Sequence, residues 1–398
     1  MGQGLYDIIE KTDFKAELAK ICVKDRLKKR TIPMEYFTFD RNELLFDEDI
    51  NVIVELIDDA AEAYKIVKTA LQNGKHVVTA NKKMMAEHLY EFADLQKKHG
   101  VSLLYEASVC GSIPIIRNLA EYYDNEMLHS VSGIFNGSSN YILTKVIQEK
   151  LSYDEALKQA QDLGFAETDP TLDVGGFDPK YKLCIVTAHA YGVFVAPEEV
   201  FNYGIQSLSE HDLEFASEKG YKLKLLANVL RVGDQQLTLF VMPYFVPREH
   251  YLYYVENEYN GVIVEAAFSD KQVFVGKGAG GHPTGSAVLS DISALRYDYK
   301  YEYKKYALGK CFDYTRQVKI EIYLRYHREE DLKLFDFEDI SIKYSGKHYN
   351  YVIGQISLAQ LFEKQAEIKA RAIFIANTGH RVALSNAPVA SPALAKVQ

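Results

Sequence analysis

The sequence predicts an α/β protein in which a parallel, helix-covered sheet is followed by two α+β domains. Three observations support this prediction. The chain has 398 residues, too many for one ordinary core, which indicates two or three domains. Strand-like and helix-like segments alternate over residues 1–126, and the pattern changes from Met127 onward. Apolar residues make up 47% and charged residues 25% of the chain, which is a globular composition.

The first domain is expected over residues 1–126. Strands are predicted at "LAKICV", "NVIVELI", "HVVTA" and "VSLLYEASV", and helices at Leu5–Glu10, at "AEAYKIVKTALQNG" and at Lys83–His99. The second helix places Val67 and Leu71 on one apolar face and ends at Gly74. Because the strands are continuously apolar, both faces of their sheet should be covered.

A second, α+β domain is expected over residues 127–283. It contains the predicted strand "HSVSGIF", the turn "NGSSN", the helices "YILTKVIQEK", "YDEALKQAQDLG" and "PKYKLCIVTAHAYG", and the later strands "LTLFVMPYFV" and "NGVIVEAAFS". The glycine loop "GKGAGG" leads into a helix near residues 284–308, which is predicted to return to the first domain.

The C-terminal part predicts a third, smaller domain over residues 312–380. Residues 318–377 have the order strand, short break, strand, strand, helix, strand. Residues 381–398 are rich in Ala and Pro and are predicted to form a flexible tail.

Composition excludes several classes of protein. The formal charge is −9, with 46 Lys and Arg against 55 Asp and Glu, so nucleic acid is not an expected partner. No apolar run reaches the roughly 20 residues that cross a bilayer. The four cysteines have neither metal-type nor disulfide-framework spacing. These features predict a cytoplasmic protein without a membrane partner.

The densest polar cluster lies in "GFAETDPTLDVGGFDPKYKL". Its charged residues include Glu167, Asp169, Asp173, Asp178 and Lys182. Asp178 precedes Pro179 and is predicted to cap a helix. Lys182 would then fall in the first helical turn, where the helix dipole disfavours a cation and so favours proton transfer. A solvated or carboxylate-paired lysine is the alternative.

Carboxylates and a lysine in one loop predict chemistry on an amino acid. The carboxylates could hold a substrate ammonium group while the lysine exchanges a proton with a hydroxyl or carbonyl oxygen. The expected reaction is therefore at an alcohol or aldehyde carbon.

Four other segments are weaker candidates. Asn81 and Lys82 follow a buried strand, at the edge where open α/β sheets bind ligands, although these residues alone favour a plain helix start with surface lysines. Cys110 is either a nucleophile or a simple buried thiol. "NGSSN" reads as a turn with Ser138 or Ser139 as the helix cap. The glycines from Gly276 to Gly281 are a weak ligand-loop signal alone.

Taken in order, these segments resemble the homoserine dehydrogenase family. The resemblance is carried by "VTANK", "EASVCGSIPII", "SGIFNGSSNYILT", "LGFAETDPTLDVGGFDPKYKL" and "GKGAGGHPTGSAVLSDI", and it covers residues 1 to about 295. It implies a Rossmann-type doubly wound domain, a substrate and dimerisation domain, and NAD(P)-dependent interconversion of L-homoserine and L-aspartate 4-semialdehyde. It also implies a homodimer or higher homo-oligomer.

The resemblance implies roles for particular residues. Lys182 matches the catalytic lysine that gives a proton to the aldehyde oxygen. Glu167 and Asp178 match substrate-binding carboxylates, Asp173 is a further candidate, and Lys82 lies by cofactor and substrate. Gly280 matches a glycine near the nicotinamide. A monovalent cation, Na⁺ or K⁺, is implied at a site whose ligands, mostly backbone carbonyls, come from Glu106, Val109, Gly111 and Ile113.

The resemblance is incomplete at the start. Family members begin with an apolar strand and a GxGxxG-type loop, and here Gly2 matches only the last of those glycines. That strand is central in a doubly wound sheet, so we expect a sheet lacking its first strand to be open and cofactor binding to be impaired. The alternative function is a remnant that only binds an amino acid.

The sequence leaves both the cofactor preference and the regulation of the protein open. Basic residues follow the second predicted strand, where cofactor preference is set, but Asp25 among them leaves NAD and NADP both possible. The domain at 312–380 resembles a regulatory domain of the ACT type with a short first helix, which allows an amino-acid effector such as threonine.

A third possible function, aspartate-semialdehyde dehydrogenase with Cys110 as nucleophile, is disfavoured, because no histidine lies in the neighbouring motif to activate the thiol.

Overall fold

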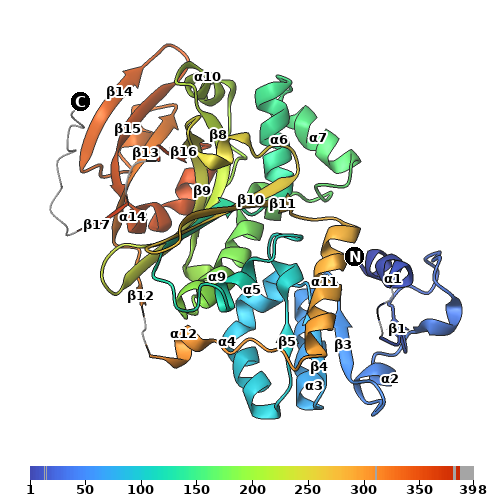
Figure 1. Ribbon diagram of the computed structural model, residues 1–398. Coiled ribbons are helices and arrows are strands. Elements are labelled where there is room, and N and C mark those ends of the chain that lie inside the picture. The colour runs from blue at the N-terminus through green and yellow to red at the C-terminus, as the bar shows by residue number, and fades with distance from the viewer. Residues whose placement is uncertain (13, 15, 310–311, 380–381, 386–398) are drawn as a thin grey trace.

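A computed structural model describes residues 1–12, 14, 16–309, 312–379 and 382–385 of the chain. It shows a mixed α/β fold with parallel strands near the N-terminus and a large, mainly antiparallel sheet after them (Figure 1). The predicted fold class is confirmed. No helix in the described ranges is long and apolar enough to cross a membrane.

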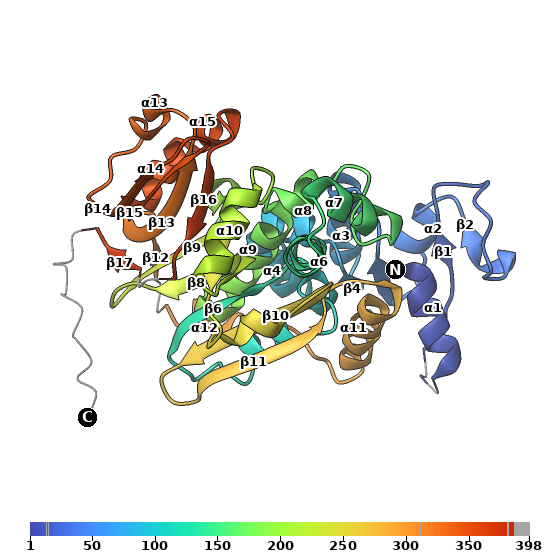
Figure 2. The same cartoon turned by 90° about the horizontal axis from the view of Figure 1, so that it is seen from above.

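The parallel strands of the first domain lie in two separate sheets. One sheet pairs β1 (Ile21–Cys22) with β2 (Phe37–Thr38), and the other has the order β3 (Val52–Glu55), β4 (His76–Thr79), β5 (Leu103–Leu104). Figure 2 shows β1 and β2 at the end of the molecule, beyond α1 (Gly2–Lys11). This is the opening of the sheet that the sequence predicts.

Helices follow the predicted order around the three-stranded sheet. Asp59 caps α3 by accepting hydrogen bonds from the amides of Ala61 and Glu62, and Gly74 after its end has φ +72°. The predicted strand "VSLLYEASV" is shorter than expected, because only Leu103 and Leu104 pair. The helices are α2 (Asn42–Leu45), α3 (Ala60–Gln72), α4 (Lys82–His99) and α5 (Ile115–Ala120), with 3₁₀ turns η1 (Met34–Tyr36) and η2 (Glu106–Ser108).

Helix α11 (Gly281–Leu295) contacts α1, η2 and β4 of the first domain, but it begins and ends earlier than the helix predicted near residues 284–308. It packs against α1 at a glycine junction, where a Cβ added to Gly4 would lie 2.3 Å from the carbonyl oxygen of Gly281. Gly285 makes a similar close approach to the backbone of Leu5. The two helices can approach this closely only because these positions lack side chains.

The large sheet joins the second and third predicted domains. Its main path within the described residues runs β11-β10-β6-β8-β9-β16-β13-β15-β14, and β16 meets β9 through the single pair Asn377 and Tyr244. The strands on this path are β6 (Leu128–Ile134), β8 (Lys222–Arg231), β9 (Gln236–Val246), β10 (Tyr259–Ala266), β11 (Asp270–Lys277), β13 (Val318–Tyr326), β14 (Asp339–Ser345), β15 (Asn350–Ser357) and β16 (Phe374–Asn377).

Shorter strands and the remaining helices complete the fold. Strands β7 (Phe201–Asn202) and β12 (Asp313–Tyr314) pair with β9. The helices are α6 (Gly137–Gln148), α7 (Tyr153–Asp162), α8 (Thr171–Val174), α9 (Phe177–Tyr191), α10 (Glu210–Glu218), α12 (Lys304–Ala307), α13 (Glu329–Leu332), α14 (Leu358–Glu363) and α15 (Gln365–Ala370), with 3₁₀ turns η3 (Pro197–Glu199) and η4 (Tyr251–Tyr254).

The predicted flexible tail is wrong at its beginning. Ala383 and Leu384 form β17, which pairs with Lys319 and Val318 of β13. Positions 386–398 of the predicted tail lie outside the described residues.

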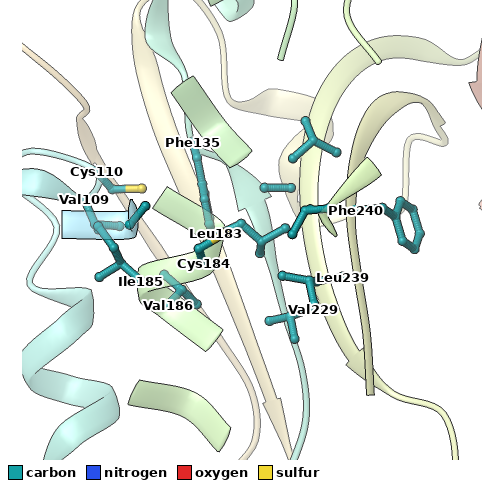
Figure 3. Close-up of a cluster of buried hydrophobic side chains, with 14 of the residues drawn as sticks. Val109, Cys110, Phe135, Leu183, Cys184, Ile185, Val186, Val229, Leu239 and Phe240 are labelled. Carbon is teal, nitrogen blue, oxygen red and sulfur yellow. The ribbon is translucent and has the colours of Figure 1, made fainter. Parts of the chain in front are cut away.

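Helix α9 runs through the hydrophobic core. Figure 3 shows its residues Leu183 and Ile185 between Val109 and Cys110 on one side and Leu239 and Phe240 of β9 on the other. Leu183, Ile185 and Phe240 are all completely buried. The helix is therefore a rigid support for the polar residues at its N-terminal end.

Candidate active site

The lysine singled out by the sequence lies in a buried polar cluster at the start of α9. Lys182 Nζ donates hydrogen bonds to Asp178 Oδ2 and to the carbonyl oxygen of Phe135, both at 2.7 Å. Lys182 is 7% exposed and Asp178 is 2% exposed. Because an ammonium group has three donors, one remains for a substrate atom.

Asp178 is shared by two lysines from different parts of the chain. Its Oδ1 atom pairs with Nζ of Lys82 at 2.7 Å, while Oδ2 binds Lys182 and also accepts from Asn136 Nδ2 at 2.9 Å. Burial opposes ionisation of this carboxyl group, but the charges of Lys182 and Lys82 outweigh it and hold the pKa of Asp178 well below its usual range. Asp178 is therefore a carboxylate that fixes both lysines.

The pKa of Asp173 in α8 is shifted in the opposite direction from that of Asp178. Burial, and then the neighbouring charge of Asp178, raise the pKa of Asp173 to about 6. The two carboxylates are joined by Asn136, whose Nδ2 also donates to Asp173 Oδ1 at 2.7 Å. Asp173 is thus a half-buried carboxylate that titrates near neutral pH.

The helix begins earlier than the sequence predicts. Gly176 is its N-cap, with φ +77°, so Asp178 is the second residue of α9, Pro179 the third and Lys182 the sixth. The predicted cap at Asp178 is therefore wrong, and so is the predicted place of Lys182 in the first turn. Because the dipole acts within the first turn, the contact with Asp178 rather than the dipole fixes Lys182. The sequence signal for this helix start is Gly176, because its left-handed φ favours glycine.

Asn136 is the site residue that the sequence interpretation missed. Its Oδ1 accepts from the amide of Ser139 at 2.8 Å, so Asn136, and not Ser138 or Ser139, caps α6. Asparagine before a helix is a recognisable cap. Its contacts with Asp173 and Asp178 join segments about 40 residues apart in sequence, and no local pattern reports them.

Lys82 and Glu167 lie at the open side of the cluster. Lys82 is the first residue of α4, capped by Asn81, and its side chain is 41% exposed. The charge of Asp178 raises the pKa of Lys82, with smaller contributions from Asp173 and Glu167. The exposed Glu167 therefore lies within electrostatic reach of the cluster.

The segment from Glu106 to Ile113 forms a tight loop beside this cluster. Both carboxylate oxygens of Glu106 accept backbone hydrogen bonds at 2.8 Å, from Ile116 and Arg117, and burial and the charge of Asp291 raise its pKa to about 8. The backbone carbonyls of Val109 and Gly111 accept no hydrogen bond in the described part of the chain. These oxygens are the kind of ligand that a monovalent cation takes.

Cys110 does not have the surroundings of a nucleophile. It is completely buried in the same loop, and burial raises the pKa of its thiol to about 12. A thiol in this state is protonated at neutral pH. The surroundings of Cys110 therefore disfavour a role as an acylated nucleophile.

Glycines gather where α1 and α11 begin. Gly2 is the first residue of α1 and is exposed, with nothing within 4 Å of an added Cβ, and Gly280 is the N-cap of α11 with φ +123°. The contact between Gly4 and Gly281 brings these two helix starts together (Figure 1). Helix N-termini offer free amides to anions, so this region fits the phosphates of a dinucleotide.

The basic loop after β1, residues 24–30, is mostly exposed and makes hydrogen bonds within itself. Arg30 donates to the backbone carbonyls of Lys28 and Asp25, and the guanidinium of Arg26 lies 4.6 Å from the ring centre of Phe39. The Asp25 carboxylate accepts from the amides of Leu27 and Lys28. The loop therefore presents mainly positive charge.

A parallel α/β domain with glycine helix starts, joined to a lysine and carboxylate cluster, defines the class of nicotinamide-dependent dehydrogenases acting on small polar substrates. Comparison with known proteins narrows this class. The family model described as "Homoserine dehydrogenase, NAD binding domain" matches residues 1–106, and that described as "Homoserine dehydrogenase" matches residues 114–293. The chain belongs to the homoserine dehydrogenase family.

Curated relatives and solved structures agree. A homoserine dehydrogenase from Lactococcus lactis is 33% identical over 90% of this chain and 89% of its own length. One from Bacillus subtilis is 39% identical over 70% of this chain, but the match spans only 64% of that relative. The crystal structure of a homoserine dehydrogenase from Thiobacillus denitrificans has a TM-score of 0.80 at 26% identity and covers 95% of both chains.

Proposed function

We propose that this chain catalyses the NAD(P)-dependent interconversion of L-homoserine and L-aspartate 4-semialdehyde. The observation that carries the proposal is the buried Lys182 with one free donor, fixed by Asp178 and the Phe135 carbonyl beside two further acidic residues. In biosynthesis this reaction serves threonine, methionine and isoleucine. We place it in the cytoplasm.

Lys182 is the proposed acid and base. In the reducing direction its ammonium group gives a proton to the aldehyde oxygen, and in the oxidising direction its amine takes the hydroxyl proton of homoserine. Two of its hydrogen bonds are already made, so its Nζ atom is held in place before substrate arrives. Asp178 provides this orientation and balances the charge.

The substrate ammonium group needs carboxylates other than those already paired. Asp178 is engaged by two lysines and Asn136. We therefore assign most of the ammonium binding to Asp173 and Glu167, with Asp178 as the inner charge and Lys82 available for the substrate carboxylate.

The cofactor assignment rests on the glycine region and the domain match. A bound nicotinamide supplies the hydride acceptor or donor. Gly2, Gly280 and Lys82 are the residues we expect to line its site, because they lie at helix starts that offer amides or a cation. One structural neighbour, an archaeal homoserine dehydrogenase of TM-score 0.58, is described in complex with NADPH. The positive loop around Arg26 is compatible with a 2′-phosphate.

We assign a monovalent cation, Na⁺ or K⁺, to the loop with backbone oxygens of Glu106, Val109, Gly111 and Ile113. The carbonyls of Val109 and Gly111 without hydrogen bonds fit such an ion. The ion would hold the loop that carries Cys110 against the glycine segment before α11. Ser112 already donates from its amide to the Lys277 carbonyl there at 3.0 Å.

The remaining assignments concern assembly and regulation. We propose a homodimer or higher homo-oligomer, supported by exposed apolar side chains on β10 and β11 such as Tyr259 and Val275. The order β13, α13, β14, β15, α14, α15, β16 supports an ACT-like module with an amino-acid effector.

The second candidate function is amino-acid binding without turnover. The separation of β1 and β2 from the three-stranded sheet favours it, because a divided sheet holds a dinucleotide less firmly.

Calorimetry separates the two functions. NADPH, NADH and L-homoserine are titrated singly into the protein, followed by a spectrophotometric assay. Binding of a dinucleotide together with homoserine-dependent formation of NAD(P)H supports the enzyme. Homoserine binding with neither dinucleotide bound supports the second function.

A further inference from the structure

The C-terminal module, residues 312–379, contacts the catalytic helix at its first residue. Lys369 of α15 places its Nζ atom 5.1 Å from the ring centre of Phe177, the residue immediately before Asp178. Gln365 of the same helix donates from Nε2 to the backbone carbonyl of Asn202. Helix α15 thus touches both α9 and the strand β7 that lies beside its start.

Asn202 connects this contact to the catalytic helix. Its Nδ2 donates to the carbonyl of Gly175 at 2.8 Å, and its Oδ1 accepts from Nζ of Lys180 at 2.9 Å. Asn202 is 2% exposed and Lys180 is 7% exposed. One buried amide therefore holds the backbone before α9 and a side chain of its first turns, with Asp178 between these two points.

The turn before α9 has little room to adjust. A Cβ added to Gly204 would lie 1.8 Å from the carbonyl of Val174, and the amide of Ile205 donates to that same carbonyl at 2.8 Å. Tyr203 in turn donates from its hydroxyl to the carbonyl of Ile373 in the module. The module is therefore bonded to the same short segment that supports the turn.

We propose that Asn202 is a positioning residue of the active site and that the C-terminal module, through Gln365, fixes its position. The proposal rests on the proposed function, since it assumes that Asp178 and Lys182 act on substrate. A shift of α15 would move the start of α9 and so the carboxylate that orients Lys182. Misplacement of such groups by about 1 Å can cost about 100-fold in rate.

The chain offers a pair of matched variants. Gln365→Leu removes the contact to Asn202, whereas Gln360→Leu removes hydrogen bonds to Asp336 that lie wholly within the module. Asn202→Asp is the third variant: it keeps an acceptor for Lys180 and loses the donor to Gly175. If Asn202→Asp does not fold, the glutamine pair alone decides the proposal.

Two measurements are made on each full-length variant: kcat and KM for homoserine, and hydrogen exchange of the amides at residues 175–185. We expect Gln365→Leu and Asn202→Asp to lower kcat about tenfold and to speed this exchange. Gln360→Leu should match the wild type in both readouts.

The proposal is overturned if Gln365→Leu exchanges like Gln360→Leu, or if exchange rises while kcat stays at the wild-type value. A wild type without turnover, combined with faster exchange in Gln365→Leu only, would instead refute the proposed function and leave the structural link in place.

Discussion

At the scale of single residues, the carboxylates of Asp178 and Asp173 differ in their partners and in the direction of their pKa shifts. Asp178 is buried and paired with two lysines, so its charge is already used in orienting them. Burial, and then the neighbouring charge of Asp178, raise the pKa of Asp173 to about 6. Breaking a buried ion pair leaves an uncompensated charge, which supports our proposal that Asp173, rather than the lysine-paired Asp178, binds the incoming ammonium group.

Asp173→Asn tests this division. Because the pKa of Asp173 is raised to about 6, its carboxylate is lost as the pH falls through 6, and the KM for homoserine should rise there in the wild type. In the variant this rise should disappear between pH 5 and 7, and KM at pH 8 should increase about tenfold through loss of one charge-assisted contact.

The measurement is a pH series of initial rates, with Asp169→Asn as the control, because Asp169 is exposed and holds the amide of Thr171. An unchanged pH dependence in Asp173→Asn would remove Asp173 from substrate binding. The same raised pKa means that ionising Asp173 costs stability in the folded state. The contribution of Asp173 to the free energy of unfolding therefore falls as pH rises through 6. This decline should be absent in Asp173→Asn.

How far the sequence predicts this site depends on the range of each contact. Lys182 and Asp178 are four residues apart on a helix, so their contact follows from local geometry. The sequence indicates Lys82 only through its position after a strand and through the family motifs. Asn136 was missed, since its role arises from contacts with residues 173 and 178 that no local pattern encodes.

At the scale of elements, close helix contact at glycines shapes the cofactor region. Gly4 and Gly281 meet without side chains, which places the starts of α1 and α11 side by side. The sequence predicts both helices and the return of α11, but not this junction. Glycine spacing in one helix does not reveal which glycine of another helix it meets.

Gly4→Ala should therefore disturb both packing and cofactor binding. Its Cβ would lie 2.3 Å from the Gly281 carbonyl, so one helix must move, at a cost of about 1–3 kcal/mol. We expect a lower melting temperature and a weaker dissociation constant for NADPH. Gly2→Ala is the control for packing, because an added Cβ there meets nothing within 4 Å. Equal melting temperatures for the two variants would contradict the junction.

At the scale of the whole molecule, the chain combines a divided parallel layer with one long, mainly antiparallel sheet. The long sheet runs from β11 to β14 and carries the C-terminal module on the same framework as the substrate site. Sequence patterns predict its strands as members of separate domains. They do not predict the junction of β16 with β9, because a pairing between distant strands leaves no local periodicity.

The divided layer should be visible in hydrogen exchange. A two-stranded sheet is marginal alone, so amides bonded between β1 and β2, such as that of Val23, should exchange much faster than those between β3 and β4. We expect a difference of at least about 100-fold, measured by mass spectrometry on the full chain. Equal protection of both sheets would show that they act as one unit.

We propose that Lys182 exchanges the proton while a bound nicotinamide exchanges the hydride. The initial rate of homoserine oxidation by the wild type and by Lys182→Ala tests both roles. We expect the wild type to turn over homoserine with NADP or NAD and the rate to fall about 1000-fold in the variant. Homoserine affinity should change little, whereas the melting temperature should fall, because the variant leaves the buried Asp178 with Lys82 as its one remaining lysine partner. Wild-type kcat in Lys182→Ala, or no turnover by the wild type with either cofactor, would contradict this proposal.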